Sequence, residues 1–141
     1  MATRIFLDTN IFLDLLDNQR QCHKEAVLLF ELIDNGEVMA FFSESVVTTT
    51  DYLLQKLLSK DLRTEFFGEI SKKIQMLPCS NMILDRAVSL EFGDLEDLVL
   101  FQLALENKVD FFITNDKKLL NSMLKGIQLI QAGQFLNIKS I

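Results

Sequence analysis

The sequence VDFFITND, at residues 109–116, is a short apolar run that ends in polar residues and a carboxylate. A run of this length, rich in aromatic and β-branched residues, is typical of a parallel strand that is buried on both faces. Residues 4–10, RIFLDTN, repeat this pattern near the other end of the chain. Ligands of open α/β sheets bind beyond the carboxyl ends of the strands, so Asp8 and Asp116 are expected to meet at one site.

Between these two runs, short apolar segments alternate with segments of helical periodicity. The expected strands are residues 4–7, 37–42, 74–77, 109–113 and 127–130, of which 74–77 is the weakest. The expected helices are residues 11–16, 23–35, 43–58, 62–73, 82–92, 95–106, 116–124 and 134–137. This alternation predicts an α/β fold, a three-layer α/β/α sandwich with a central parallel sheet of four to five strands.

The chain of 141 residues has the length of one domain, expected to span residues 1–141. Hydrophobic residues make up 49% of it, which excludes a disordered chain. It shows no secretory leader pattern and no apolar run of the roughly 18 residues that a membrane span needs, so a cytoplasmic protein is expected. The net charge of −6 argues against a simple basic nucleic-acid binder, although bound cations would offset part of that charge.

Asp8 and Asp116 each stand where a predicted strand ends. There a carboxylate can bind a cation, or it can accept a hydrogen bond as the N-cap of the next helix. Asn10 and Thr114 lie within two residues of these acids, and their polar groups can steady a carboxylate or a water molecule. The residues alone leave both roles open for the two acids.

Asp51 lies on an otherwise apolar stripe of the predicted helix 43–58, where a carboxylate is costly unless it is paired or binds a metal. Residues 94–97, DLED, begin another predicted helix. Asp97 is nearest to the apolar part of that helix and is the preferred ligand, whereas Asp94 is either a supporting acid or a helix cap. Glu96 is expected to face solvent.

Carboxylate oxygens are the ligands that Mg²⁺ prefers, and two ions about 4 Å apart can activate a water molecule for attack on phosphorus. Such a mechanism needs no histidine base. His23, the sole histidine, is expected to begin a helix. The sequence contains no Gly-rich phosphate loop and no Ser or Cys nucleophile motif, which leaves metal-assisted hydrolysis of a phosphodiester as the leading hypothesis.

Four motifs, in this order, resemble those of the PIN domain family, which includes the VapC-type toxin ribonucleases: LDTN at 7–10, TTDY at 49–52, DLED at 94–97 and TND at 114–116. The resemblance covers nearly the whole chain. It implies a catalytic and metal-binding set with supporting positions. The catalytic, metal-binding set is Asp8, Asp51, Asp97 and Asp116, and the supporting set is Asn10, Asp94 and Thr114.

The resemblance further implies an endoribonuclease that uses one or two Mg²⁺ or Mn²⁺ ions and is the toxin of a toxin–antitoxin pair. Its expected partners are an RNA substrate, an antitoxin protein and a second copy of the chain in a homodimer. Many relatives carry Glu in the second motif, and Asp51 is one methylene shorter. Glu44 is a substitute ligand by position, but it is expected in the solvated first turn of its helix.

Two other functions are weighed against this one. A Mg²⁺-dependent phosphatase would need a nucleophile companion two residues after Asp8, where Asn10 stands. A PIN-like module that binds RNA or protein without cutting it is disfavoured by the four intact acids.

The helices after the second expected strand carry more large apolar side chains than one small sheet face needs. This seam is defined by Leu53, Leu57, Leu58, Phe66 and Phe67. An excess of exposed apolar surface predicts a homodimer interface, and the alternative is that all five side chains belong to the core.

Overall fold

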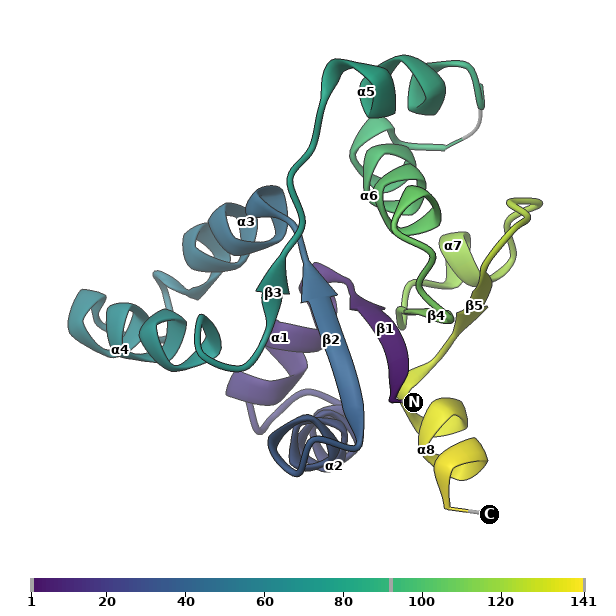
Figure 1. Cartoon of the computed structure of the whole chain (residues 1–141). Helices are drawn as coiled ribbons and strands as arrows, with labels where there is room; N and C mark the ends of the chain where they lie inside the picture. The colour runs from purple at the N-terminus through teal and green to yellow at the C-terminus, as the bar shows by residue number, and fades with distance from the viewer. Residues whose placement is uncertain (1, 92, 141) are drawn as a thin grey trace.

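The structure is a computed structural model that describes residues 2–91 and 93–140 (Figure 1). Its five strands are β1 (Thr3–Leu7), β2 (Val38–Phe42), β3 (Gln75–Met76), β4 (Phe111–Ile113) and β5 (Gln128–Ile130). They form one parallel sheet in the order β3-β2-β1-β4-β5. The prediction of a central parallel sheet is therefore confirmed, with the larger of the two expected strand numbers.

The helices lie between and around these strands. They are α1 (Thr9–Leu16), α2 (His23–Asp34), α3 (Glu44–Leu54), α4 (Lys60–Ile70), α5 (Asn81–Val88), α6 (Leu95–Glu106), α7 (Lys117–Leu120) and α8 (Ala132–Lys139). None of the helices in the described ranges is long and apolar enough to cross a membrane.

Both faces of the sheet are covered, as the three-layer prediction requires. Ile5, Phe6 and Leu7 are consecutive in β1, so their side chains point alternately to the two faces, and all three are 0% exposed. Phe6 pairs in register with Phe112 of β4, and their rings stack with centroids 5.2 Å apart. The centre of the sheet is thus buried from above and below, which explains the continuous apolar runs of β1 and β4.

The chain reverses its direction of winding at β1, because β2 lies on one side of that strand and β4 on the other. A crevice forms beyond the carboxyl ends of the strands at such a switch point. Backbone hydrogen bonds continue the pairing to this edge: Asp8 N–H donates to the carbonyl of Ile113 at 3.2 Å, and Thr114 N–H donates to the carbonyl of Ile130 at 3.0 Å. The residues that follow β1 and β4 are consequently held side by side.

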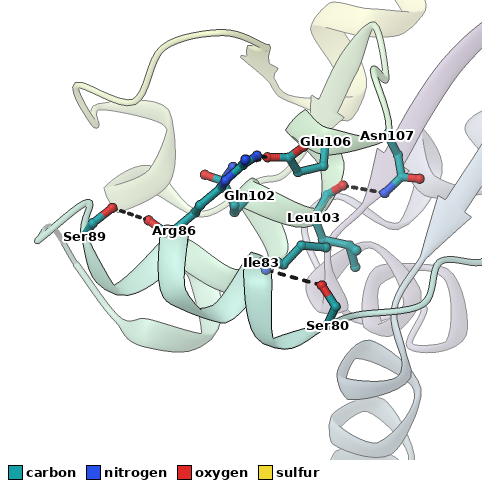
Figure 2. A network of polar contacts seen from close by, with 8 residues as sticks. All are labelled: Ser80, Ile83, Arg86, Ser89, Gln102, Leu103, Glu106 and Asn107. Carbon is teal, nitrogen blue, oxygen red and sulfur yellow. Dashed lines mark hydrogen bonds and ion pairs between the residues drawn. The ribbon is translucent and has the colours of Figure 1, made fainter.

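The carboxyl-terminal end of α6 is anchored against α5, as Figure 2 shows. Arg86 of α5 forms an ion pair with Glu106 of α6, and Gln102 donates to the same carboxylate at 3.0 Å. Asn107 donates its side-chain N–H to the carbonyl of Leu103 at 2.8 Å. These contacts fix the helix whose first turn carries Asp97.

Several predicted helices extend too far, and in two of them the following turn explains the early end. Helix α7 ends at Leu120 and not at residue 124, because the chain turns at Asn121 and then packs against α6. Helix α3 ends at Leu54 and not at residue 58, because a turn follows in which the N–H groups of residues 57 and 58 share the carbonyl of Leu54.

Other boundaries differ as well. Helix α4 spans Lys60–Ile70 and not residues 62–73, and α8 spans Ala132–Lys139 and not residues 134–137. Helix α5 ends at Val88, and residue 92 of the predicted helix 82–92 lies outside the described residues. Strand β4 begins at Phe111 and not at residue 109. Lys108 has a positive φ of 55°, and Val109 N–H still bonds to the carbonyl of Ala104, so the chain is closing α6 at that point.

Replacing Phe112 by Ala should lower the free energy of unfolding by about 3–5 kcal/mol, because it leaves a cavity between two stacked aromatic layers. The matched control is Met123→Ala, whose side chain is 77% exposed and whose loss should change stability by no more than about 0.5 kcal/mol. Urea unfolding followed by circular dichroism measures both. Equal effects in the two variants would contradict the assignment of Phe112 to the core.

Candidate functional site

The hydroxyl of Thr114 connects the ends of β1 and β4. It donates to Asp8 Oδ2 at 2.6 Å and accepts from the backbone N–H of Asp116 at 3.0 Å. Thr114 is completely buried and Asp8 is 6% exposed, so the contact is shielded from water. One side chain thereby sets the position of two acids that are far apart in the sequence.

Burial raises the pKa of Asp8 above its ordinary value. The hydrogen bond from Thr114 acts in the opposite direction, because it stabilises the charged form, while the charges of Asp116 and Glu96 raise the pKa further. The buried hydroxyl of the next residue, Thr9, has no hydrogen-bond partner within the described part of the chain. A buried carboxylate and an unpartnered hydroxyl thus occur at adjacent positions in the sequence.

Asp97 lies in the first turn of α6 and is half-buried. Burial is the largest cause that raises its pKa to about 6, followed by the charges of Asp8, Asp116, Asp94 and Glu96. Every charged group that acts on Asp97 is itself a carboxylate. The structure therefore brings Asp8, Asp97 and Asp116 together, with Asp94 and the exposed Glu96 beside them, and their negative charge has no cationic side chain to balance it among these groups.

The three N-cap positions differ in how their side chains are used. Asp116 caps α7, because its Oδ1 accepts from the N–H of Lys118 at 2.9 Å. Asp8 and Asp94 occupy the N-cap positions of α1 and α6, but neither side chain makes a capping hydrogen bond. The carboxylate of Asp94 is consequently not committed to its helix.

Asp51 is placed differently from the other predicted ligands. Its Oδ1 accepts from Arg63 Nε on α4 at 2.8 Å, and Arg63 also donates to the carbonyl of Leu58 at 2.7 Å. The Asp51 side chain is 43% exposed, and Asp51 is not among the groups that shift the pKa of Asp8 or Asp97. The structure thus does not bring Asp51 together with the other acids, and its role as a ligand stays a prediction.

Sequence reasoning missed Asp14, which is 4% exposed although it carries a charge. Its Oδ1 accepts from Arg20 at 2.7 Å and its Oδ2 accepts from Asn115 at 2.9 Å. Asn115 stands between Thr114 and Asp116, so Asp14 ties the loop after β4 to α1. The signal was present, because Asp14 interrupts the apolar run of residues 11–16 just as Asp51 interrupts its own helix.

Asn10, predicted as a supporting residue, lies on α1 at the edge of this network. It lines a cavity of 270 Å³ together with Asp14, Arg20 and Asn115. Asn10 therefore lies near Asn115, in the loop that carries Asp116.

The acids fit a hard divalent cation in their chemistry. They offer only oxygen donors, and Asp8 and Asp97 are held with like charges around them, which a cation would relieve. Among the described residues, no three Asp, Glu, His or Cys side chains lie close enough to form a ready ligand set. Mg²⁺ is usually held by only one or two direct carboxylates with several waters, so binding needs a modest rearrangement and no prebuilt cage.

Comparison with known proteins identifies the relatives of this chain. The PIN domain family model matches residues 4–118. A relative from Aquifex aeolicus (strain VF5), named Ribonuclease VapC1, is 25% identical over 121 residues, which are 82% of this chain and 83% of the relative. The residues matched by the family model include all four predicted acids.

Solved structures show the same fold. VapBC2 from Rickettsia felis, bound to a DNA fragment from its promoter, has a TM-score of 0.67 at 16% identity and covers 92% of this chain and 98% of its own. FitAcB from Neisseria gonorrhoeae has a TM-score of 0.63 at 13% identity, with the same coverage of 92% and 98%. VapC20 from Mycobacterium tuberculosis, a toxin that cleaves the sarcin–ricin loop, has a TM-score of 0.62 at 14% identity and covers 77% of this chain and 86% of its own.

The metal-free protein should lose stability as the pH rises from about 4 to about 6. The folded pKa of Asp97 is about 6 and its ordinary value is 3.8, so the folded state binds more protons in this window. The part due to Asp97 should be on the order of 1 kcal/mol, since solvent screens a half-exposed group. Urea unfolding in EDTA at several pH values should show a shallower dependence for Asp97→Asn, and an identical dependence would contradict the clustering of the acids.

Proposed function

The chain belongs to the PIN domain family, and from this premise we propose that it is an endoribonuclease that hydrolyses RNA phosphodiester bonds with Mg²⁺ or Mn²⁺ as cofactor. The observation that carries this proposal is the group of acids at the carboxyl edge of the sheet, where each charge that acts on Asp97 is negative. A relative named as a ribonuclease, at 25% identity over most of both chains, supports the same activity. The proposed cation ligands are Asp8, Asp97 and Asp116.

When bound, one or two divalent cations supply positive charge for the phosphate oxygens and lower the pKa of a water molecule. The residues of the chain have distinct tasks around them. Thr114 holds the Asp8 carboxylate in one orientation through its hydroxyl. The same hydroxyl accepts from Asp116 N–H, so the two acids keep their spacing while a substrate enters and leaves.

Asp97 has a pKa that burial and the neighbouring acids raise toward neutral pH. With a pKa of about 6, its carboxyl group is mostly ionised at neutral pH, and below pH 6 a cation would have to displace its proton. Asp94 lies at the mouth of the site with an uncommitted carboxylate, where it can accept hydrogen bonds from substrate or water. The exposed positions of Asp94 and Glu96 leave this side of the site open to a polymer.

We further propose that the protein is the toxin of a toxin–antitoxin pair and acts in the cytoplasm. The similar solved structures include VapBC2, a complex bound to its promoter DNA, and VapC20, a toxin. An antitoxin protein is accordingly the proposed macromolecular partner beside the RNA substrate.

Asp8→Asn tests the cleavage mechanism. The amide keeps an oxygen that accepts from Thr114 but removes the charge needed for the cation, so cleavage of a fluorescent single-stranded RNA should fall by at least about 100-fold. Thermal unfolding without metal should be unchanged or shifted upward, because a buried charge is lost. The upward shift of the melting temperature that Mg²⁺ gives to the wild type should disappear. Cleavage by the variant at the wild-type rate would exclude this mechanism.

Asp51→Asn provides the comparison that defines the ligand set. Since Arg63 already balances the charge of Asp51, this variant should keep most of the Mg²⁺-dependent shift, whereas Asp97→Asn should lose it. If both variants lose the shift equally, Asp51 leaves Arg63 and binds the cation, as the family resemblance implies.

A homodimer is the proposed assembly. The exposure of the seam residues indicates which of them are available to form it. Leu53 on α3 and Leu57 in the turn that follows are 48% and 49% exposed, and the adjacent Tyr52 is 71% exposed. Phe66 packs against the core and contacts Phe12 edge to face, so it belongs mainly to the interior. The exposed leucines are therefore the interface candidates among the seam residues.

Leu57→Glu should convert a dimer into folded monomers, because a carboxylate in an apolar interface is left unpaired and desolvated. Light scattering at micromolar concentrations measures the mass, and circular dichroism confirms the fold. The control is Leu62→Glu on α4, an equally exposed leucine outside the seam, which should leave the mass unchanged. A wild-type monomer across this range would refute the homodimer.

A further inference from the structure

A cavity of 350 Å³ opens directly beside the acids, between the first turn of α6 and helix α7. Three leucines, Leu98, Leu119 and Leu124, form its apolar wall. Asp94, Asp97 and Lys118 also line it. The cavity and the cation site therefore share Asp97, and a ligand in one is adjacent to a ligand in the other.

The apolar wall is firmly held. Leu98 and Leu119 are both 4% exposed and belong to the interior. The segment that carries Leu124 is held against α6 at Gly126, where a Cβ atom would lie 2.7 Å from Leu105 Cδ1 and where φ is +115°. A φ of +115° is one that L side chains rarely adopt, so glycine suits this approach of the segment to α6.

The polar groups of the cavity have unused bonding capacity. Asp94 makes no capping hydrogen bond, so its carboxylate can accept N–H groups from a ligand. Lys118 is exposed, and none of the ion pairs within the described residues involves it. A ligand that suits these groups is flat and apolar on its faces, carries N–H donors on one edge, and is attached to an anion.

We propose that this cavity binds one unpaired nucleobase of the RNA, next to the phosphate that is cleaved. This inference rests on the proposed function and adds to it a base-binding subsite, which an unpaired base can enter because it has no duplex stack to leave. The faces of the base lie against Leu98 and Leu124, its donor edge faces Asp94, and Lys118 contacts a neighbouring phosphate. Carboxylates accept from the exocyclic amine of cytosine, so cytosine is favoured over uracil, which has no amine.

Mononucleotides test the subsite without any cleavage, because they contain no phosphodiester bond. The wild-type protein in Mg²⁺, with ¹³C-labelled leucine methyl groups, is titrated with cytidine 5′-phosphate, uridine 5′-phosphate and ribose 5-phosphate. We expect saturable shifts of the Leu98, Leu119 and Leu124 methyl signals with the cytidine nucleotide. Binding should be at least about fivefold weaker for ribose 5-phosphate, which lacks the base. The uridine nucleotide should bind more weakly than the cytidine nucleotide.

Leu124→Trp and Met123→Trp form the matched pair of variants. The first fills the cavity and should weaken binding of cytidine 5′-phosphate to the level of ribose 5-phosphate. The second places the same ring one residue away on a side chain that is 77% exposed, and it should bind like the wild type. If Leu124→Trp does not fold, Asp94→Asn replaces it, and the preference for cytidine over uridine should then decrease.

Equal binding of the cytidine nucleotide and ribose 5-phosphate, without shifts of the three leucines, would overturn the subsite. This outcome is separate from failure of the proposed function. RNA cleavage with no nucleobase binding would refute only the subsite. Nucleobase binding with no cleavage of any RNA would refute the nuclease and leave a nucleotide-binding cavity.

Discussion

The hydrogen bond from Thr114 to Asp8, 2.6 Å long and buried, is the contact on which the candidate site depends. The two residues are 106 positions apart and meet only because β1 and β4 pair in parallel with Leu7 opposite Ile113. A slip of one residue in this register would turn Thr114 to the other face of the sheet. The core contact between Phe6 and Phe112 fixes the register and so also fixes the site.

The carboxylates are kept close by contacts that lie away from them. The ion pair between Arg86 and Glu106 holds the far end of α6, and Asp14 holds the loop after β4 through Asn115. Without these restraints, repulsion among Asp8, Asp97 and Asp116 would be relieved by movement of the helix or the loop. The fold instead retains the repulsion, which adds to the larger effect of burial in raising the pKa of Asp97 to about 6.

The order of strands and helices could be predicted, because buried parallel strands give uninterrupted apolar runs and the helices between them are amphipathic. The meeting of Asp8 and Asp116 followed from this topology, whereas Asp97 was selected for its place near the apolar part of its helix and from the family resemblance. The environment of Asp51 could not be predicted, because it depends on an early end of α3 that brings Arg63 within 2.8 Å. The length of α7 likewise depends on the close packing of Gly126 against Leu105, a contact between segments that the sequence does not mark.

The net charge of −6 gains a structural meaning from the proposed function. Five carboxylates act on one another at one edge of the sheet, so the empty site repels the phosphates of RNA. The proposed divalent cations would offset most of this negative charge, and Lys118 lines the cavity that Asp97 also lines. In a protein with a net charge of −6, the proposed RNA binding then relies on the cation and on contacts with a base. A nucleobase cavity adjoining the acids supplies the second of these, and it gives affinity that salt does not screen.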